Sequence, residues 1–261
     1  MIRSKLQTLL WFLQRPPLYP ELVRLALGQF FLGATKTEDS SEEMVSWCEE
    51  RSLDTPRGLE QLIGMTRVTP LEELFPDLWQ EAIQRESRCS VLMGGAGNVE
   101  LLYYSAEYLQ AVRVIETGVA YGWSSLAFLL SLKNRPGSQL VSTDMPYRKR
   151  NNDPYVGCVV PAEFKQNWHL IRLADRQGLP QGIQRLGEID LCHYDSDKSY
   201  EGRMWAYPLL WQALRPGGFL ISDDIGDNVA FRDFANQVQG DPLVVRKEQK
   251  YMGILVKPKG E

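Results

Sequence analysis

The spacing of hydrophobic residues differs between two parts of the chain. Residues 1–88 carry helical patterns separated by proline-containing and polar turns, and no strand pattern is evident among them. After about residue 98, short β-branched runs alternate with helical patterns, which is typical of a parallel sheet covered by helices. The chain is therefore predicted to be an α/β protein with a helical N-terminal extension over residues 1–88 and one main domain over residues 89–261.

Seven strands are predicted in the second part. They cover residues 112–116, 139–144, 169–174, 189–194, 218–223, 242–247 and 251–256. The last two strands are separated by only three residues, which is room for a hairpin turn and nothing longer. We therefore expect the final strand to be antiparallel in an otherwise parallel sheet.

The most apolar part of the extension lies near its start. Residues 21–31 are apolar on nearly all sides, so this helix is expected to be buried against the core or against a second copy of the chain. The apolar run over residues 22–33 is about half the length of a membrane span and contains Arg24 and Gln29. No transmembrane segment is predicted.

Composition and charge narrow the range of partners. The chain has 44% hydrophobic residues and a formal net charge of −4, so it has no broad basic field with which to grip nucleic acid. A small-molecule substrate is expected instead. The four cysteines are widely spaced and form no C-x-x-C pair, which argues against a zinc site or a disulfide framework and favours a cytoplasmic location.

A glycine-containing turn follows the first predicted strand. Gly118 and Gly122 lie in this turn, and a predicted helix over residues 124–132 begins directly after it. Glycine lets the backbone approach a ligand closely, and the N-terminus of a helix exposes free N–H groups. The G-x-x-x-G spacing is neither that of dinucleotide-binding proteins nor that of a P-loop. We therefore expect a cofactor without a pyrophosphate.

Two acidic residues end the next two strands. Asp144 ends the second strand, where its carboxylate can accept hydrogen bonds from both hydroxyls of a ribose, and Asp175 ends the third. Open α/β sheets bind ligands at this edge. The alternative is that Gly118 and Gly122 only form a tight turn and that the two acids are exposed helix caps.

Three more acidic residues end the fourth and fifth strands. Asp195 follows the fourth strand, and Asp223 and Asp224 end the fifth. Neighbouring strands lie about 4.8 Å apart, so these carboxylates converge and repel one another unless a cation neutralises them. Oxygen ligands suit Mg²⁺, Mn²⁺ or Ca²⁺ rather than zinc. The pattern predicts a divalent-metal site.

Taken together, these residues resemble the class I S-adenosylmethionine (SAM) dependent methyltransferases over roughly residues 90–256. The resemblance rests on Glu116-x-Gly118-x-x-x-Gly122, on Asp144, and on the Leu214-Arg215-Pro216-Gly217-Gly218 segment before a strand. It implies a Rossmann-like class I fold with a seven-stranded mixed sheet in the order 3-2-1-4-5-7-6.

The resemblance also implies how SAM is held. Gly118 and Gly122 would pass under its amino-acid part, with Glu116 facing that part through its surroundings. Ser124 would hold the carboxylate, Asp144 the ribose, and Met145 would pack against the adenosine. The implied cofactor-binding set consists of Glu116, Gly118, Ala120, Gly122, Ser124, Asp144, Met145 and Asp175.

The acidic residues resemble a narrower group. Asp195-x-Asp197-Lys198 with Asp223-Asp224 is similar to the metal-dependent O-methyltransferases of the catechol and macrocin types, closest to the branch that includes cephalosporin hydroxylase-like proteins. By this resemblance Asp195, Asp223 and Asp224 bind Mg²⁺ or a similar cation. Asp197 matches the base of the sugar-modifying enzymes, and Lys198 has the spacing of the catechol enzymes. Both are candidate catalytic residues, and Asp197 is the first choice, with Lys198 as an alternative ion-pair partner of the acids.

The implied function is metal-assisted O-methylation of a small hydroxylated molecule, such as a sugar or a glycosylated natural product. One alternative is a metal-independent methyltransferase whose acids bind polar substrate groups. Another is a non-catalytic SAM-binding or scaffold protein. A nicotinamide-dependent oxidoreductase is disfavoured because G-x-G-x-x-G is missing. The N-terminal helices are expected to form part of the substrate pocket or a homo-oligomer interface.

Three further features have open interpretations. His193 is expected to be a core histidine rather than a ligand or base. Residues 93–98 form a glycine-rich turn that either closes over the methionine end of SAM or is a simple loop. Residues 146–157 are long for a connection from strand to helix, so they are interpreted as a substrate loop or as a solvated loop, with Arg148, Lys149 and Arg150 as its basic cluster.

Overall fold

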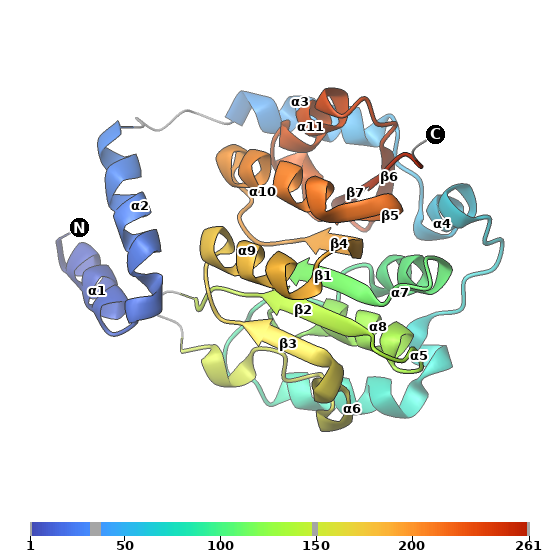
Figure 1. Ribbon diagram of the computed structural model, residues 1–261, viewed down its shortest axis with the longest axis horizontal. Coiled ribbons are helices and arrows are strands. Elements are labelled where there is room, and N and C mark those ends of the chain that lie inside the picture. Colours follow the sequence, from blue (N-terminus) through green and yellow to red (C-terminus); the bar gives the residue numbers. More distant parts are fainter. Residues whose placement is uncertain (1, 32–37, 148–150, 260–261) are drawn as a thin grey trace.

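A seven-stranded sheet runs through the middle of the protein, with helices on both of its faces (Figure 1). The computed structural model describes residues 2–31, 38–147 and 151–259. The strand order is β3-β2-β1-β4-β5-β7-β6. Strand β7 is antiparallel to both β5 and β6, and the other neighbouring strands are parallel. The predicted order and the predicted antiparallel final strand are confirmed.

The seven strands lie close to their predicted positions. They are β1 (Arg113–Thr117), β2 (Gln139–Thr143), β3 (Trp168–Ile171), β4 (Ile189–Tyr194), β5 (Leu214–Ser222), β6 (Leu243–Lys247) and β7 (Lys250–Val256). Strand β5 begins four residues earlier than predicted because its start pairs with the chain after β7, where Gly217 N–H donates to the Lys257 carbonyl at 2.7 Å. Strand β3 ends three residues early, because the chain turns there towards the helix that starts at Asp175.

Helices connect the strands and fill the extension. The α-helices are α1 (Ile2–Leu13), α2 (Tyr19–Phe31), α3 (Glu38–Glu49), α4 (Thr55–Ile63), α5 (Leu71–Leu74), α6 (Pro76–Ser87), α7 (Val99–Tyr108), α8 (Trp123–Leu132), α9 (Asp175–Leu186), α10 (Tyr200–Ala213) and α11 (Ala230–Gln237). Short 3₁₀ turns are η1 (Pro16–Leu18), η2 (Asp153–Tyr155), η3 (Ala162–Asn167) and η4 (Ile225–Asp227). The predicted helical character of the extension is confirmed.

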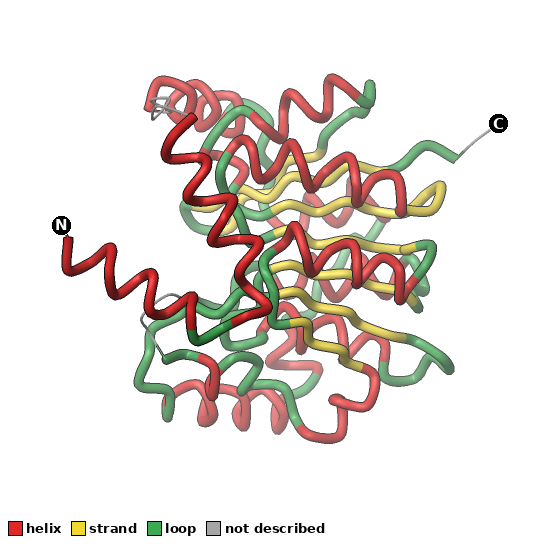
Figure 2. Tube along the Cα trace, turned by 60° about the vertical axis from the view of Figure 1, so that its left-hand side comes forward, coloured by secondary structure: helices red, strands yellow, loops and turns green. Residues whose placement is uncertain are grey.

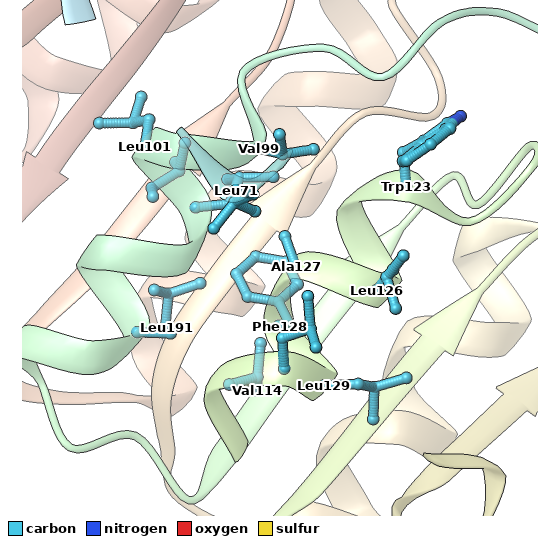
Figure 3. Close-up of a cluster of buried hydrophobic side chains, with 14 of the residues drawn as sticks. Leu71, Val99, Leu101, Val114, Trp123, Leu126, Ala127, Phe128, Leu129 and Leu191 are labelled. Carbon is cyan, nitrogen blue, oxygen red and sulfur yellow. The ribbon is translucent and has the colours of Figure 1, made fainter. Parts of the chain in front are cut away.

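Two hydrophobic clusters hold the layers together, one on each face of the sheet. Helices α7 and α8 pack on one face, where Phe128 and Leu126 belong to the same buried cluster as Val114 and Leu191 from the strands (Figure 3). Helices α9, α10 and α11 cover the other face. Because both faces are covered, the central strands are buried almost throughout, as their near-continuous apolar runs require.

The extension has two parts with different surroundings. Residues of α4, α5 and α6, including Leu59, Leu71 and Ala82, share the hydrophobic cluster of α7 and α8. In contrast, α1 and α2 stand at the carboxyl ends of the strands, and α1 projects away from the rest of the chain (Figures 1 and 2). None of the helices in the described part of the chain has the length and apolar content needed to cross a bilayer.

Asp190 ties the starts of three strands together, opposite the edge at which the acids gather. Its Oδ2 accepts N–H hydrogen bonds from Val112 and Arg113, both at 2.8 Å, and its Oδ1 accepts one from Arg215 Nε at 2.6 Å. Asp190 itself lies in β4, while Arg113 begins β1 and Arg215 lies in β5. This one carboxylate therefore fixes the relative position of the central strands.

We expect Asp190→Ala to lower the free energy of unfolding by about 2 kcal/mol, because three charge-assisted hydrogen bonds lose their acceptor. Urea unfolding monitored by circular dichroism measures the change. Asp241→Ala is the control, since Asp241 is an exposed acid just before β6. Equal stability of the two variants would contradict the role given to Asp190.

Candidate functional site

A cavity of 1270 Å³ opens at the carboxyl ends of the strands. Its wall includes the turn after β1, the segments after β2, β3 and β4, the 93–98 loop, helix α2 and the β6–β7 hairpin. Pockets for one drug-sized ligand usually measure about 300–1,000 Å³. The cavity therefore has room for two small molecules side by side.

The turn after β1 comes very close to the neighbouring strand end. Gly118 has φ +76°, and a Cβ added to it would lie 2.1 Å from the backbone oxygen of Asp195. Gly122 has φ +95°, and a Cβ there would lie 2.9 Å from Gly157 Cα. Both positions therefore require glycine, for backbone conformation and for space. Helix α8 begins at Trp123, directly after this turn, so its N-terminus faces the cavity region as predicted.

Glu116 lies beneath this turn and has no exposed surface. Its Oε2 accepts hydrogen bonds from Ser125 Oγ at 2.5 Å and from Ser142 Oγ at 2.7 Å. Neither Glu116 nor Gly122 lines the cavity, whereas Gly118, Ala120 and Ser124 do. Glu116 thus joins β1, β2 and α8 below the turn and supports it from behind.

Asp144 is fixed at the cavity wall by donors from two directions. Its Oδ2 accepts the N–H groups of Val119 at 2.8 Å and Ala120 at 3.3 Å, and Arg172 donates to its Oδ1. The residue is only 3% exposed. This burial raises the pKa of the Asp144 carboxyl, while Arg172 and the two N–H groups oppose the rise. Met145, the next residue, also lines the cavity.

Asp175 both lines the cavity and supports the loop after β4. Its Oδ2 accepts hydrogen bonds from Ser196 Oγ at 2.5 Å and from Tyr194 OH at 3.2 Å. Burial raises the pKa of Asp175, and these two hydroxyl groups oppose that rise. Asp175 was predicted at the end of the third strand, but it is the first residue of α9, because β3 already ends at Ile171. The loop that contains Asp195 and Lys198 is therefore held in place from the start of α9.

The acidic cluster of Asp195, Asp223 and Asp224 is interleaved with lysines. Asp195 and Asp223 line the cavity, but Asp224 does not. Lys198 contacts both Asp195, with Nζ 3.2 Å from Oδ1, and Asp224. Lys250 Nζ lies 3.2 Å from Asp224 Oδ1. Two of the three carboxylates, those of Asp195 and Asp224, thus pair with two ammonium groups.

The pKa shifts follow this arrangement. Burial raises the pKa of Asp195 to about 6, and the neighbouring Asp223 carboxylate adds to the rise. Burial alone would raise the pKa of Asp224, but Lys198 and Lys250 hold it below its usual range. Burial alone would lower the pKa of Lys198, yet Asp195 and Asp224 outweigh it and raise that pKa. Lys198 is therefore an ammonium group at neutral pH.

The structure does not support the predicted metal site. Among residues 2–31, 38–147 and 151–259, no group of three or more His, Cys, Asp or Glu side chains is arranged to hold a metal ion. The Lys198 ammonium lies against one carboxylate oxygen of Asp195 and one of Asp224. Asp224 also has a left-handed backbone, with φ +50° and ψ +40°, and lies outside the cavity lining while Asp223 lies within it. As arranged, this donor set does not fit a divalent cation.

The two predicted catalytic residues both line the cavity. The Oδ1 of Asp197 accepts the N–H of Ser199 at 3.1 Å, just before α10 begins, and its carboxyl group packs against Gly202. Lys198 forms ion pairs with Asp195 and Asp224, which is the alternative role predicted for it from the sequence. Asp197 therefore shapes the loop, while Lys198 presents a positive charge beside Asp195.

His193 borders the same cavity although its imidazole is only 3% exposed. Its Nδ1 lies 3.9 Å from Glu116 Oε1. Burial alone would lower the pKa of His193, but Glu116, Asp195 and Asp223 outweigh it and raise that pKa. Alternation along β4 places His193 on the same face as Asp195, a signal that identifies it as part of the site. The expectation of a buried histidine holds, but it lies at the floor of the cavity and not away from it.

Two loops whose roles the sequence leaves undecided, residues 93–98 and 146–157, contact each other at the cavity. Residues 93–98 line it, and so do Pro146 and Tyr147. Asn152 connects the two loops, because its Oδ1 accepts the Tyr147 N–H at 3.0 Å and its Nδ2 donates to Met93 Sδ at 3.4 Å. Both loops are therefore walls of the site. The basic cluster of residues 148–150 lies outside the described residues.

Sequence reasoning missed the contribution of the β6–β7 hairpin and of α9 and α10. The hairpin brings Lys247, Glu248 and Lys250 to the cavity. From the other helices come Arg176 and Trp205, with the Arg176 guanidinium carbon 4.9 Å from the centre of the Trp205 ring. The sequence predicts the hairpin, but no local pattern indicates which edge of the sheet its turn reaches.

Part of the chain matches a known family. Residues 115–225 match the family model described as a methyltransferase domain. This segment runs from β1 to the end of the acidic cluster and leaves out the N-terminal helices and the final hairpin. No curated protein matches the chain.

Solved structures share the fold at low sequence identity. An O-methyltransferase from Bacillus cereus in complex with SAH is 13% identical, with a TM-score of 0.54 over 80% of this chain and 100% of that one. An SAH-bound methyltransferase from Podospora anserina is 15% identical, with a TM-score of 0.52 over 87% of this chain and 100% of that one. A putative O-methyltransferase from Klebsiella pneumoniae is 14% identical, with a TM-score of 0.50, covering 81% of this chain and 99% of that one. These likenesses show that the fold is the Rossmann-like fold of methyltransferases.

The opposite pKa shifts in the acidic cluster predict opposite effects on stability. Between pH 3.8 and about 6, folded Asp195 binds its proton more tightly than the unfolded chain does, so its contribution to stability falls as the pH rises through that window. Asp195→Asn should therefore raise the free energy of unfolding at pH 8 by about 1 kcal/mol and flatten its dependence on pH between 4 and 6.

Asp224→Asn is the matched variant with the opposite sign. Its folded pKa is lowered, so its carboxylate contributes stability that is present above pH 3.8 and lost in more acidic solution. This variant should be less stable than the wild type at pH 8. Urea unfolding from pH 4 to 8, in buffer with EDTA, measures both. Two variants with the same sign at pH 8 would contradict the described charge arrangement.

Proposed function

We propose that the chain is a SAM-dependent O-methyltransferase that methylates a hydroxyl group of a small molecule. The observation that carries this proposal is the common cavity: the Gly118 turn, the fixed Asp144 carboxylate and the Lys198–Asp195 pair all line it. Its 1270 Å³ fit a cofactor and an acceptor together. The methyltransferase-domain match over residues 115–225 supports the same reaction class.

The cofactor would occupy the part of the cavity along β1, β2 and β3. Asp144 has its carboxylate fixed by backbone N–H groups and Arg172, so it is ready to accept the two ribose hydroxyls. Met145 and Asp175 also line the cavity and would border the adenine. Gly118 lines the cavity directly beside the β4 tip, so the methionine part would pass close to that tip. The bound SAM supplies a sulfonium whose methyl group is ready for transfer.

The acceptor would lie towards β4, β5 and the hairpin. Methyl transfer needs an oxygen nucleophile held in line with the methyl group. The Lys198 ammonium would attract an acceptor oxygen and stabilise its negative charge as the proton leaves. Asp195, whose pKa is about 6, would be ionised at neutral pH and beside that oxygen, so it would accept the proton. Asp197 is the second candidate for this base.

Binding of a divalent cation at the acceptor end would require the side chains of Lys198, Asp195 and Asp224 to rearrange. Burial and the Asp223 carboxylate raise the pKa of Asp195, and a bound cation would relieve this repulsion. However, the cation would have to displace the Lys198 ammonium from Asp195 and Asp224. The identity of the acceptor as a sugar or glycosylated natural product rests on the sequence resemblance.

The first test measures cofactor binding by isothermal titration with SAM and SAH. We expect Gly118→Ala to weaken SAH binding about a hundredfold or more, because its Cβ would overlap the Asp195 carbonyl. Gly95→Ala is the control, since Gly95 also lines the cavity but an added Cβ would meet no atom within 4 Å. A wild-type chain that binds neither SAM nor SAH would overturn the proposal.

The second test follows methyl transfer from labelled SAM to a panel of phenols, catechols and glycosides. Lys198→Met should lower kcat about a hundredfold while SAH affinity changes little, because the lost charge acts on the acceptor and not on the cofactor. The assay is run with EDTA and with added Mg²⁺. Full activity in EDTA supports the lysine-assisted reaction, whereas activity that requires Mg²⁺ assigns the acidic cluster to a metal.

A further inference from the structure

We propose that the N-terminal helices α1 and α2 form the outer wall of the cofactor part of the cavity and tighten cofactor binding through Arg172 and Asp153. This inference rests on the proposed function. It assigns a cofactor-binding role to the helices that the methyltransferase-domain match leaves out.

The hydrophobic contacts place these helices directly on the ends of β2 and β3. Trp11, Phe12 and Leu18 form a buried cluster of their own, separate from the two clusters of the sheet. Met145 and Leu173 pack against this cluster. Met145 follows Asp144, and Leu173 follows Arg172. The N-terminal cluster therefore rests on the two segments that would hold the ribose and the adenine.

Helix α2 also reaches the cavity itself. Glu21, Arg24 and Leu25 line it. Glu21 is only 5% exposed, and its carboxylate accepts hydrogen bonds from Arg24 Nε at 2.9 Å and Arg24 Nη2 at 2.6 Å. A buried, paired carboxylate on a cavity wall is unusual on a helix that merely covers a surface. Figure 1 shows α2 standing across the carboxyl ends of the strands, consistent with a wall of this site.

A chain of ion pairs links the N-terminal segment to Asp144. Arg172 donates to Asp144 Oδ1 with one guanidinium nitrogen and to Asp153 Oδ1, at 2.6 Å, with another. Arg15 Nη2 lies 3.6 Å from Asp153 Oδ2. Arg15 is held in turn by Trp11, with its guanidinium carbon 4.4 Å from the ring centre. Asp153 is therefore the one acid shared by Arg15 and Arg172 in this chain of contacts.

Arg172 is a positioning residue for the cofactor. Burial raises the pKa of Asp144, and a protonated carboxyl group would lose acceptor capacity for the ribose hydroxyls. Arg172 opposes that rise and also fixes the rotation of the carboxylate. Asp153 and the N-terminal helices hold Arg172 and cover Met145. Cofactor affinity should therefore depend on residues that do not touch the cofactor.

The test compares SAH affinity in four variants of the full chain by isothermal titration. Arg172→Gln should raise the Kd for SAH at least about tenfold, because Asp144 then loses its buried ionic partner. Arg172→Lys should recover only part of the lost affinity. The ammonium restores the positive charge beside Asp144, but it cannot bridge both acids as a guanidinium does. Asp153→Asn and Arg15→Gln should each raise the Kd about threefold, as expected for partly exposed ion pairs.

Two further measurements separate this role from a general loss of stability. The Arg15→Gln change should add little in the Asp153→Asn background, because both act through the same link. Amide hydrogen exchange of residues 11–25 should slow when SAH binds to the wild type and should slow much less in Asp153→Asn. Glu43→Gln is the control: it breaks an ion pair with Arg232, 2.6 Å long, that does not line the cavity, and should leave both readouts unchanged.

The outcomes are distinct. If the wild type binds SAH but Asp153→Asn and Arg172→Gln bind it equally well, the inference is overturned and the proposed function stands. If SAH binding leaves the exchange of residues 11–25 unchanged in the wild type, the N-terminal helices are not a wall of the cofactor site. If the wild type binds no SAH at all, both the proposed function and this inference fail.

Discussion

The close approach of Gly118 to the carbonyl oxygen of Asp195 is the constraint on which the site depends. Strands β1 and β4 are neighbours in the sheet, and their carboxyl ends almost touch where an added Cβ would lie 2.1 Å from that oxygen. The turn that would receive the cofactor and the loop that bears Lys198 are therefore in contact. Asp175, at the start of α9, holds the same loop, so the ends of β1 and β4 and the start of α9 together form the floor of the site. A methyl group transferred across this floor would travel between segments whose separation is set by the sheet.

Charge at this floor is balanced by residues from distant parts of the sequence. Arg172 offsets the buried Asp144, and Lys198 and Lys250 offset Asp224. Asp195 is compensated only in part, because burial and Asp223 raise its pKa more than Lys198 lowers it. A carboxylate that the fold disfavours in its charged form costs stability and is suited to accepting a proton. The same physical situation therefore explains both the expected stabilisation by Asp195→Asn and the role proposed for Asp195.

The sequence predicted the fold well because the fold depends on patterns that are local. Period-two and buried apolar runs marked every strand, and the short Glu248 turn indicated the antiparallel end of the sheet. It also placed Gly118, Asp144 and Asp195 at one edge of the sheet, where they line the cavity, since each follows a strand that points to that edge. The predicted ends of strands are wrong where the start of the following element determines them, as at the end of β3. Lys250 and Arg24 could not be placed at the site in this way, because the positions of the hairpin and of α2 depend on tertiary packing.

The predicted metal site shows that the type and strand position of acidic residues do not by themselves establish a metal site. Asp195, Asp223 and Asp224 do gather at one edge, as the strand ends require. The sequence pattern does not give the orientation of each carboxylate or the ammonium groups that contact it. Asp224 lies outside the cavity lining and contacts Lys198 and Lys250, and Lys198 also contacts Asp195. A divalent cation would have to compete with an ammonium group that is already paired with two of its ligands. The positions of Lys198 and Lys250 therefore decide whether a lysine or a metal ion would lie beside the acceptor. These positions are set by the loop after β4 and by the β6–β7 hairpin, and not by the acids themselves.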